Sequence, residues 1–110
     1  MYDEMSDRLM ISSREENEVI EGSVRLLNII FDLTIENRVA NIELLNASDY
    51  LDSLDIDSSI LTNLVGAEFV IKKAQYGYLI SIVLRSPRAV ARVPYNIHLP
   101  SEKEVILNVA

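Results

Sequence analysis

The sequence predicts an α+β fold, in which a mostly antiparallel β-meander sheet of about six or seven strands carries one short helical segment between two groups of strands. Two features predict this arrangement. Apolar and polar residues alternate along much of both halves of the chain, which is the period of a half-buried strand. Between the halves, over residues 49–65, the apolar spacing changes to that of a helix face.

The length of the chain, 110 residues, is close to the commonest size of one domain. We therefore expect a single domain over residues 1–110. Within it, residues 1–48 form the first β-meander, residues 49–66 the helical segment and residues 67–110 the second β-meander.

Strands of the first meander are predicted over residues 7–12, 26–33 and 39–46, where apolar side chains recur at every second position. The glycine at position 22 interrupts an otherwise apolar stretch and marks a bulge or bend before the long second strand. Each strand thus directs one face toward a common core.

The helical segment is expected to begin at residue 49, because Ser48 is suited to cap a helix and Asp49 and Asp52 then fall in the first turn. Asp57 and the serines after it offer a second capping cluster. One helix, or two short ones, is expected across residues 49–65.

The second meander is predicted over residues 69–74, 78–85, 91–99 and 104–109. Pro94 has no N–H to donate, which places the third of these strands at an edge or a bulge. The apolar faces of both meanders and the helical segment predict one core, formed by Leu9, Ile11, Ile29, Phe31, Ile42, Leu44, Leu61, Leu64, Ile80 and Ile82.

A weak internal similarity relates the two meanders at an offset of 51 residues. Phe31 and Ile42, for example, fall on Ile82 and Val93. Either a duplication or the shared pattern of two hairpins explains it.

The charge is strongly asymmetric. Residues 1–57 contain 14 of the 17 acidic residues and four of the ten basic ones, so this half is negative although the chain as a whole carries −7. An acidic half repels nucleic acid and attracts basic surfaces. We expect the interaction surface to contain Asp3, Glu4, Asp7, Glu15, Glu16 and Glu18.

No catalytic or cofactor-binding constellation is recognisable. The chain has no cysteine, one histidine (His98) and three glycines, which excludes thiolate sites and glycine-rich phosphate loops. The acidic residues 49, 52, 55 and 57 lack the glycine and closing glutamate of a calcium loop. One cluster of basic residues lies near Tyr76 and Tyr78 and consists of Lys72, Lys73, Arg85, Arg88 and Arg92. A solvated sheet face explains this cluster better than a nucleic-acid site does.

Several motifs within residues 2–55 resemble a known family. They are Tyr2-Asp3, then Asp7-x-Leu9-x-Ile11, then Ile29-Ile30-Phe31-Asp32, and then Ile42-Glu43-Leu44-Leu45-Asn46-Ala47-Ser48. The pattern is similar to that of a small prokaryotic family, the domain of unknown function 2283. The resemblance implies a fold core and no catalytic residues, and it implies a suspected association with small toxin-like nucleases.

The expected function is that of a small intracellular, cytoplasmic protein-interaction module, more an antitoxin-like cover for a basic partner than an enzyme. The alternative is a divalent-cation-binding protein or small enzyme that uses the acidic region 49–57. We expect no cofactor and no membrane association, because the start is acidic and the apolar stretches are short. A homodimer through a strand edge is expected, because a meander leaves its edges open.

Overall fold

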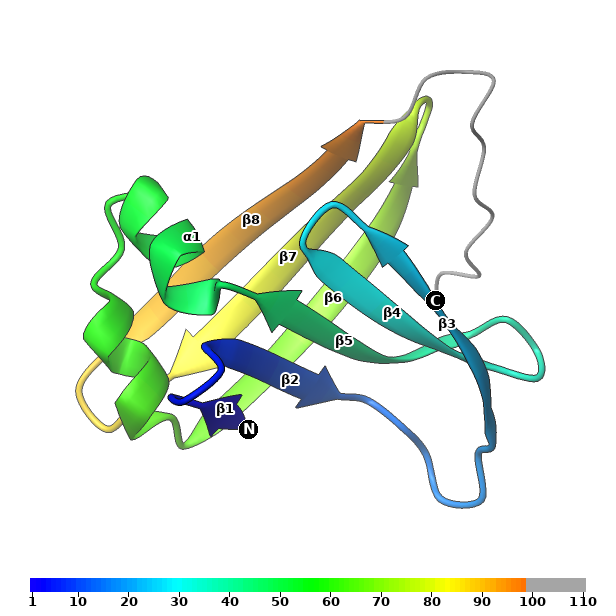
Figure 1. Ribbon diagram of the computed structural model, residues 1–110, viewed down its shortest axis with the longest axis horizontal. Helices are drawn as coiled ribbons and strands as arrows, with labels where there is room; N and C mark the ends of the chain where they lie inside the picture. Colours follow the sequence, from blue (N-terminus) through cyan, green and yellow to red (C-terminus); the bar gives the residue numbers. More distant parts are fainter. Residues whose placement is uncertain (99–110) are drawn as a thin grey trace.

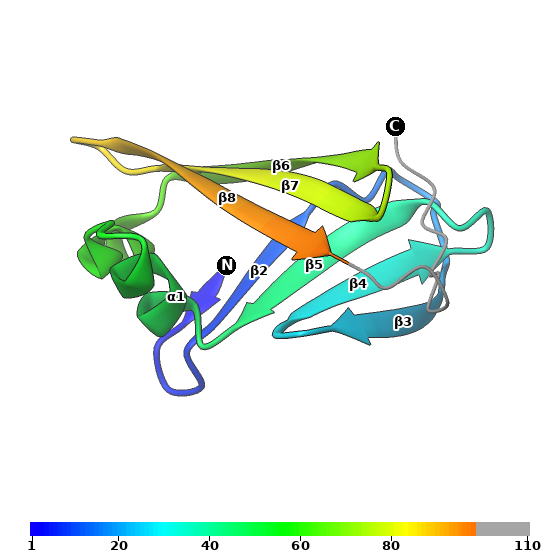
Figure 2. The same cartoon turned by 90° about the horizontal axis from the view of Figure 1, so that it is seen from above.

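Two antiparallel sheets pack face to face, and a short helical segment lies at one end between them (Figures 1 and 2). The computed structural model describes residues 1–98. The strands in chain order are β1 (Tyr2–Asp3), β2 (Arg8–Ser12), β3 (Ile20–Leu26), β4 (Ile29–Thr34), β5 (Val39–Leu45), β6 (Gly66–Ala74), β7 (Gly77–Arg85) and β8 (Val90–His98). The α-helix α1 (Ala47–Ser53) and the 3₁₀-helix η1 (Ser58–Asn63) separate β5 from β6.

The predicted α+β class and the antiparallel pairing are confirmed, and the strands are divided differently from the prediction. Instead of one sheet of six or seven strands, residues 1–98 form a five-stranded sheet in the order β1-β2-β5-β4-β3 and a three-stranded sheet in the order β6-β7-β8. The predicted strand 104–109 lies outside the described residues.

The inner face of the five-stranded sheet is built from two rows of apolar side chains. Leu9, Leu44 and Ile29 lie opposite one another across β2, β5 and β4. Ile11, Ile42 and Phe31 form the next row. All six are buried, because alternation along each strand places them on the face that meets the second sheet.

The three-stranded sheet supplies the facing surface. Phe69, Ile82 and Val93 form one row across β6, β7 and β8. Ile71, Ile80 and Tyr95 form another, next to the first. The two sheets and the helical segment share a single hydrophobic core. It contains nine of the ten predicted core residues, and the tenth, Leu64, is partly buried against it.

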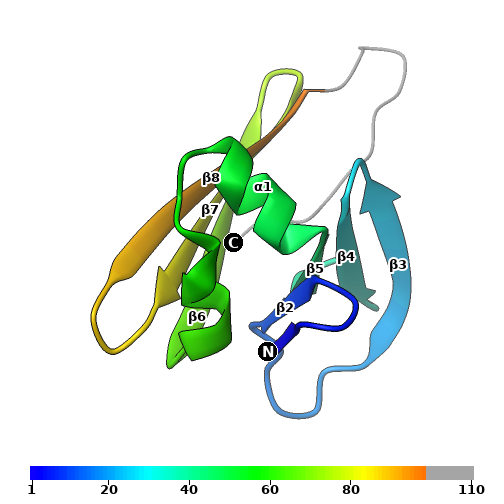
Figure 3. The same ribbon diagram turned by 60° about the vertical axis from the view of Figure 1, so that its left-hand side comes forward.

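The helical segment consists of two short helices, one of the two predicted forms. Figure 3 shows them in front, with one sheet on either side. The prediction that Ser48 caps the first helix was wrong. Asn46 occupies the cap position, with a left-handed backbone and no side-chain cap bond, and Ser48 lies inside the first turn. Asp57 does cap η1, since its side chain accepts the N–H of Ser59.

A second correction concerns the predicted strand 26–33, which is interrupted by a two-residue turn at Leu27 and Asn28. Leu27 adopts a positive φ of 55°, which is unusual for leucine. Tertiary hydrogen bonds hold this turn, because the Asn28 amide donates to the Leu45 carbonyl at 2.8 Å. The register shift near Gly22 confirms the predicted irregularity in β3.

Tyr95 joins the two sheets through the same turn. Its hydroxyl hydrogen-bonds with the Asn28 side chain and accepts the Asn28 N–H at 3.3 Å. Tyr95 lies on β8 and Asn28 between β3 and β4, so this polar contact crosses the core and fixes how the layers meet. Burial raises the pKa of Tyr95, which keeps the phenol protonated.

The internal similarity at an offset of 51 residues extends to the way the strands pair in the two sheets. Phe31 pairs with Ile42 and Ile29 with Leu44. In the second sheet, Ile82 pairs with Val93 and Ile80 with Tyr95 at the same offset. All eight side chains are buried, so the β4–β5 and β7–β8 hairpins present equivalent positions to the core.

We expect Phe31→Ala to lower the free energy of unfolding by about 3–5 kcal/mol, because it leaves a cavity where a fully buried ring packs. A urea titration measures the change. The control is Ile35→Ala, since Ile35 is exposed and should cost no more than about 0.5 kcal/mol. A loss below about 1 kcal/mol for Phe31→Ala would contradict the assigned core.

Tyr95→Phe should cost about 1–3 kcal/mol, because the partly buried amide and N–H of Asn28 lose their partner while packing is kept. Tyr76→Phe is the matched control, as Tyr76 is exposed and its hydroxyl accepts from Gln75. Equal urea midpoints for the two variants would show that the contact between the sheets does not stabilise the fold.

Candidate functional site

Asp7 connects the turn after β1 with the first turn of α1. Its carboxylate accepts the N–H of Ser48 at 2.9 Å and the hydroxyl of Ser48 at 2.7 Å. Its main-chain carbonyl accepts the N–H of Ala47 at 3.0 Å. The hydroxyl of Tyr2 donates to the same carboxylate at 2.6 Å. Asp7 therefore supplies, from 41 residues away in sequence, the helix cap that Asn46 does not provide.

The network shifts the pKa of both titratable members. Burial favours protonated Asp7, but hydrogen bonds from Tyr2 and from the side chain and backbone of Ser48 outweigh it and hold the pKa of Asp7 below its usual value. The hydrogen bond to Asp7, together with burial and the charge of Asp7, raises the pKa of Tyr2 to about 12. Asp7 is thus ionised and Tyr2 neutral at neutral pH.

The six predicted acidic residues fall into two groups at opposite ends of β2 (Figure 1). The first group, Asp3, Glu4 and Asp7, lies on the β1–β2 hairpin. The Asp3 carboxylate accepts the hydroxyl of Ser6 at 2.7 Å and the N–H of Met5 at 3.0 Å. These bonds lower the pKa of Asp3, so its exposed charge is held in a defined place.

The second group, Glu15, Glu16 and Glu18, lies in the loop between β2 and β3. Glu18 forms a two-point ion pair with Arg38, with N–O distances of 2.9 and 3.1 Å. It also accepts the N–H of Glu15 at 2.6 Å. Glu15 and Glu16 are exposed. Glu15 also lies 3.9 Å from Arg38. Among the six residues, Asp7 and Glu18 are partly buried, and the other four are exposed to solvent.

The acidic residues of the helical segment do not form a metal site. Asp57 is occupied as the cap of η1, which lowers its pKa through hydrogen bonds from Ser59. Asp49, Asp52 and Asp55 are exposed. Within residues 1–98, no three histidine, aspartate or glutamate side chains come together in a way that would hold a metal ion.

Most of the predicted basic cluster lies on the second sheet. Lys72, Arg85 and Arg92 are exposed on β6, β7 and β8. Arg85 pairs with Glu68 at 2.7 Å. Tyr78 is buried in the core, so it is not available to stack on a base. His98 is exposed and lies edge-on to Tyr76, with 6.3 Å between the ring centres.

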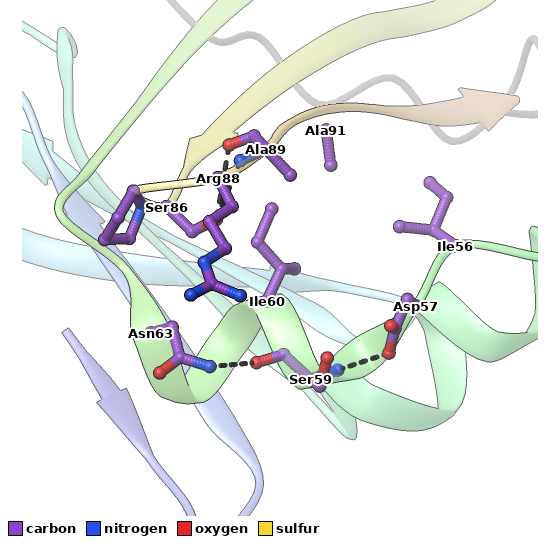
Figure 4. A pocket seen from close by; sticks show the side chains of 10 residues that line it. Ile56, Asp57, Ser59, Ile60, Asn63, Ser86, Arg88, Ala89 and Ala91 are labelled. Carbon is purple, nitrogen blue, oxygen red and sulfur yellow. Dashed lines mark hydrogen bonds between the residues drawn. The ribbon is translucent and has the colours of Figure 1, made fainter.

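A pocket lies between η1 and the turn that joins β7 to β8 (Figure 4). Arg88 extends from the turn across the pocket, and Ser59, Asn63 and Asp57 line the opposite side. Asp57 and Ser59 are engaged with each other, as are Ser59 and Asn63. These hydrogen bonds engage part of the polar lining, and the Arg88 guanidinium lies across from it.

No helix among residues 1–98 has the length and apolar character needed to cross a membrane. The sequence predicts Asp7 as part of an acidic surface, whereas in the structure Asp7 joins the β1–β2 hairpin to α1. The sequence feature that corresponds to this role is an aspartate after β1 together with Ala-Ser at the start of the helix. It indicates a helix cap only once the two segments are known to lie side by side.

Comparison with known families supports the resemblance. Residues 1–48 match a family described as a protein of unknown function, DUF2283. No curated protein and no solved structure gives a significant match. The matched region contains the whole five-stranded sheet and ends at Ser48, the residue that Asp7 holds. The chain therefore resembles DUF2283 over this sheet, and the three-stranded sheet lies outside the match.

We expect Asp7→Ala to destabilise the protein at pH 7 by about 2–4 kcal/mol, through loss of a helix cap and strain at the left-handed φ of 55°. Asp49→Ala, in the first turn of the same helix, should cost about 0.3–1 kcal/mol. Urea titrations give both values.

The effect of Asp7→Ala should depend on pH. Because the folded pKa of Asp7 is lowered, its ionic contribution is present above the unfolded value of about 4 and is lost as the pH falls through the folded value. The difference between wild type and Asp7→Ala should therefore shrink in strong acid. An undiminished difference there would contradict stabilisation by the ionised carboxylate.

Proposed function

We propose that the protein is a non-enzymatic interaction module whose acidic first half docks on a basic partner protein, in the manner of an antitoxin that covers a basic nuclease. One observation carries the proposal. Of the 14 acidic residues in positions 1–57, ten are exposed. The negative charge is thus available at the surface.

The basic residues of the same half are too few to neutralise this surface, four against 14 acidic residues. Arg8 and Arg38 pair with Glu43 and Glu18. The other two arginines bind main-chain carbonyls, Arg14 that of Glu18 and Arg25 that of Leu27, each at 3.0 Å. All four arginines thus have partners in the same chain, and the exposed ones, Arg8, Arg14 and Arg25, offset only part of the negative charge. A surface of one sign accelerates encounter with a partner of the other sign and selects against nucleic acid.

Self-association through a strand edge is part of the same proposal. On β8, Pro94 has no N–H and its carbonyl accepts the hydroxyl of Tyr50, so the middle of this edge is closed to a further strand. On the other sheet, β3 pairs only with β4 among the described strands, and it is the edge that we propose for a homodimer.

Co-purification from the native host tests docking on a basic partner. We expect a basic protein that is retained at low salt and released as the ionic strength rises, since exposed charge pairs are screened beyond about 10 Å at 0.1 M. Glu4→Gln combined with Glu16→Gln removes one exposed carboxylate from each acidic group and should lower the salt concentration needed for release.

The matched control is Asp52→Asn combined with Asp55→Asn. It removes the same charge from the exposed helical segment, away from the acidic residues 3–18 through which we propose that the first half docks, and should release the partner at the wild-type salt concentration. If both double variants lowered the salt concentration of release equally, binding would depend on the overall negative charge and not on this surface. A partner held equally well at high salt would contradict electrostatic docking.

A further inference from the structure

One wall of the pocket between η1 and β8 is a turn that its own hydrogen bonds hold in place. The N–H and the hydroxyl of Ser86 both donate to the Ala89 carbonyl, at 2.9 and 3.3 Å, and the N–H of Ala89 donates to the Ser86 hydroxyl oxygen at 3.1 Å. Between them, the ring of Pro87 restricts the backbone further. The backbone that carries Arg88 is therefore fixed relative to the pocket.

Arg88 brings a cation with unused donors into this pocket. Its guanidinium extends from the turn toward η1 (Figure 4), and it makes no hydrogen bond or ion pair within residues 1–98. Arginine stays protonated at neutral pH, and its planar fork of N–H groups matches the two oxygens of a carboxylate. This end of the pocket is therefore suited to a carboxylate.

Asp57 brings a negative charge to the other end of the pocket. Figure 4 shows its carboxylate beside Ile56, whereas the Arg88 guanidinium lies toward Asn63. Hydrogen bonds from the N–H and side chain of Ser59 lower the pKa of Asp57, so it is ionised at neutral pH. No ion pair joins Asp57 to Arg88 in the described part of the chain, so the pocket has one positive and one negative end.

The lining between the two charges is mainly apolar. Ile56, Ile60 and Ala91 supply hydrocarbon surface. Asn63 donates its side-chain amide to the Ser59 carbonyl at 3.1 Å, which leaves the amide oxygen of Asn63 to accept from a ligand. The volume of the pocket, about 660 Å³, is in the range of small-molecule sites.

The order of these groups selects a class of ligand. Along the pocket, a cation, a neutral acceptor and an anion are supplied by Arg88, Asn63 and Asp57. The complementary order is a carboxylate, an N–H and an ammonium, which is the order of groups along a short peptide from its C-terminus to its N-terminus. A single amino acid carries both charges on one carbon and cannot place them at opposite ends of the pocket.

We propose that this pocket binds an apolar dipeptide or tripeptide by both of its free termini, with the carboxylate at Arg88 and the ammonium at Asp57. The side chains of the peptide would pack on Ile56, Ile60 and Ala91. The site is separate from the acidic residues 3–18, so this inference goes beyond the proposed function and does not depend on it.

The probes are leucyl-leucine with both termini free, its N-acetylated form and its C-terminal amide. Titration followed by ¹H–¹⁵N NMR gives the affinity and the place of binding. We expect the free dipeptide to bind most tightly and to shift the backbone signals of Ser59, Asn63 and Ala89. Blocking either terminus should weaken binding about three- to tenfold, as expected for one exposed, charge-assisted contact.

Substitutions at the two charged residues test each end of the pocket separately. Arg88→Gln should weaken binding of the free and acetylated dipeptides, which keep the carboxylate, and leave the amide nearly unchanged. Asp57→Asn should weaken binding of the free dipeptide and the amide, which keep the ammonium, and leave the acetylated form nearly unchanged. Asparagine caps a helix as well as aspartate does, so this variant keeps the start of η1.

The matched controls are Arg92→Gln and Asp52→Asn, which remove the same charges from exposed positions outside the pocket. Neither should change the affinity for any of the three probes. Equal losses in Arg88→Gln and Arg92→Gln would attribute binding to overall charge and overturn the inference. Equal affinities of the free and blocked dipeptides would show that the termini are not recognised. Signals of residues 56–63 and 86–91 that do not shift and saturate would exclude the pocket as the site.

Discussion

The five-stranded sheet has one apolar face that is stable only when it is shielded from water. Leu9, Ile29, Phe31, Ile42 and Leu44 are each no more than 1% exposed, and all belong to that face. Removing such side chains from water is the dominant favourable contribution to folding, so the sheet requires a cover. The three-stranded sheet supplies it, and the position of every other element follows from the way the two layers meet.

Three polar contacts hold the layers in their relative position. Asp7 fixes the start of α1 to the β1–β2 hairpin, which places the helical segment at one end of the core. Tyr50 on α1 hydrogen-bonds to the Pro94 carbonyl of β8. Tyr95 bonds with Asn28 across the core. Apolar packing alone tolerates sliding of one sheet on another, whereas hydrogen bonds of defined geometry specify one arrangement.

Much of this fold was predictable because its signals are local. The alternation that buries Leu9 and Ile11 and exposes Met10 is a property of five consecutive residues. The division into two sheets depends instead on which strands pair, and no single segment encodes it. The turn at Leu27 was missed because leucine rarely adopts a positive φ, and distant contacts to Leu45 and Tyr95 stabilise it.

The candidate surface was only partly predictable for a similar reason. The acidic excess can be counted in the sequence, but counting does not separate a carboxylate that holds a helix, such as Asp7, from one that faces solvent, such as Glu4. Glu18 likewise required the approach of Arg38 from 20 residues away.

Because the sheet that covers the inner face belongs to the same chain, formation of the core is a unimolecular step. A molecule limited to residues 1–48 would expose the inner face until a second molecule arrived, so its stability would rise with its concentration. In the present chain the helical segment tethers both layers, and their meeting is intramolecular. The β7–β8 hairpin, whose buried pairs repeat those of β4–β5, thus covers the inner face of the first sheet from within the same chain.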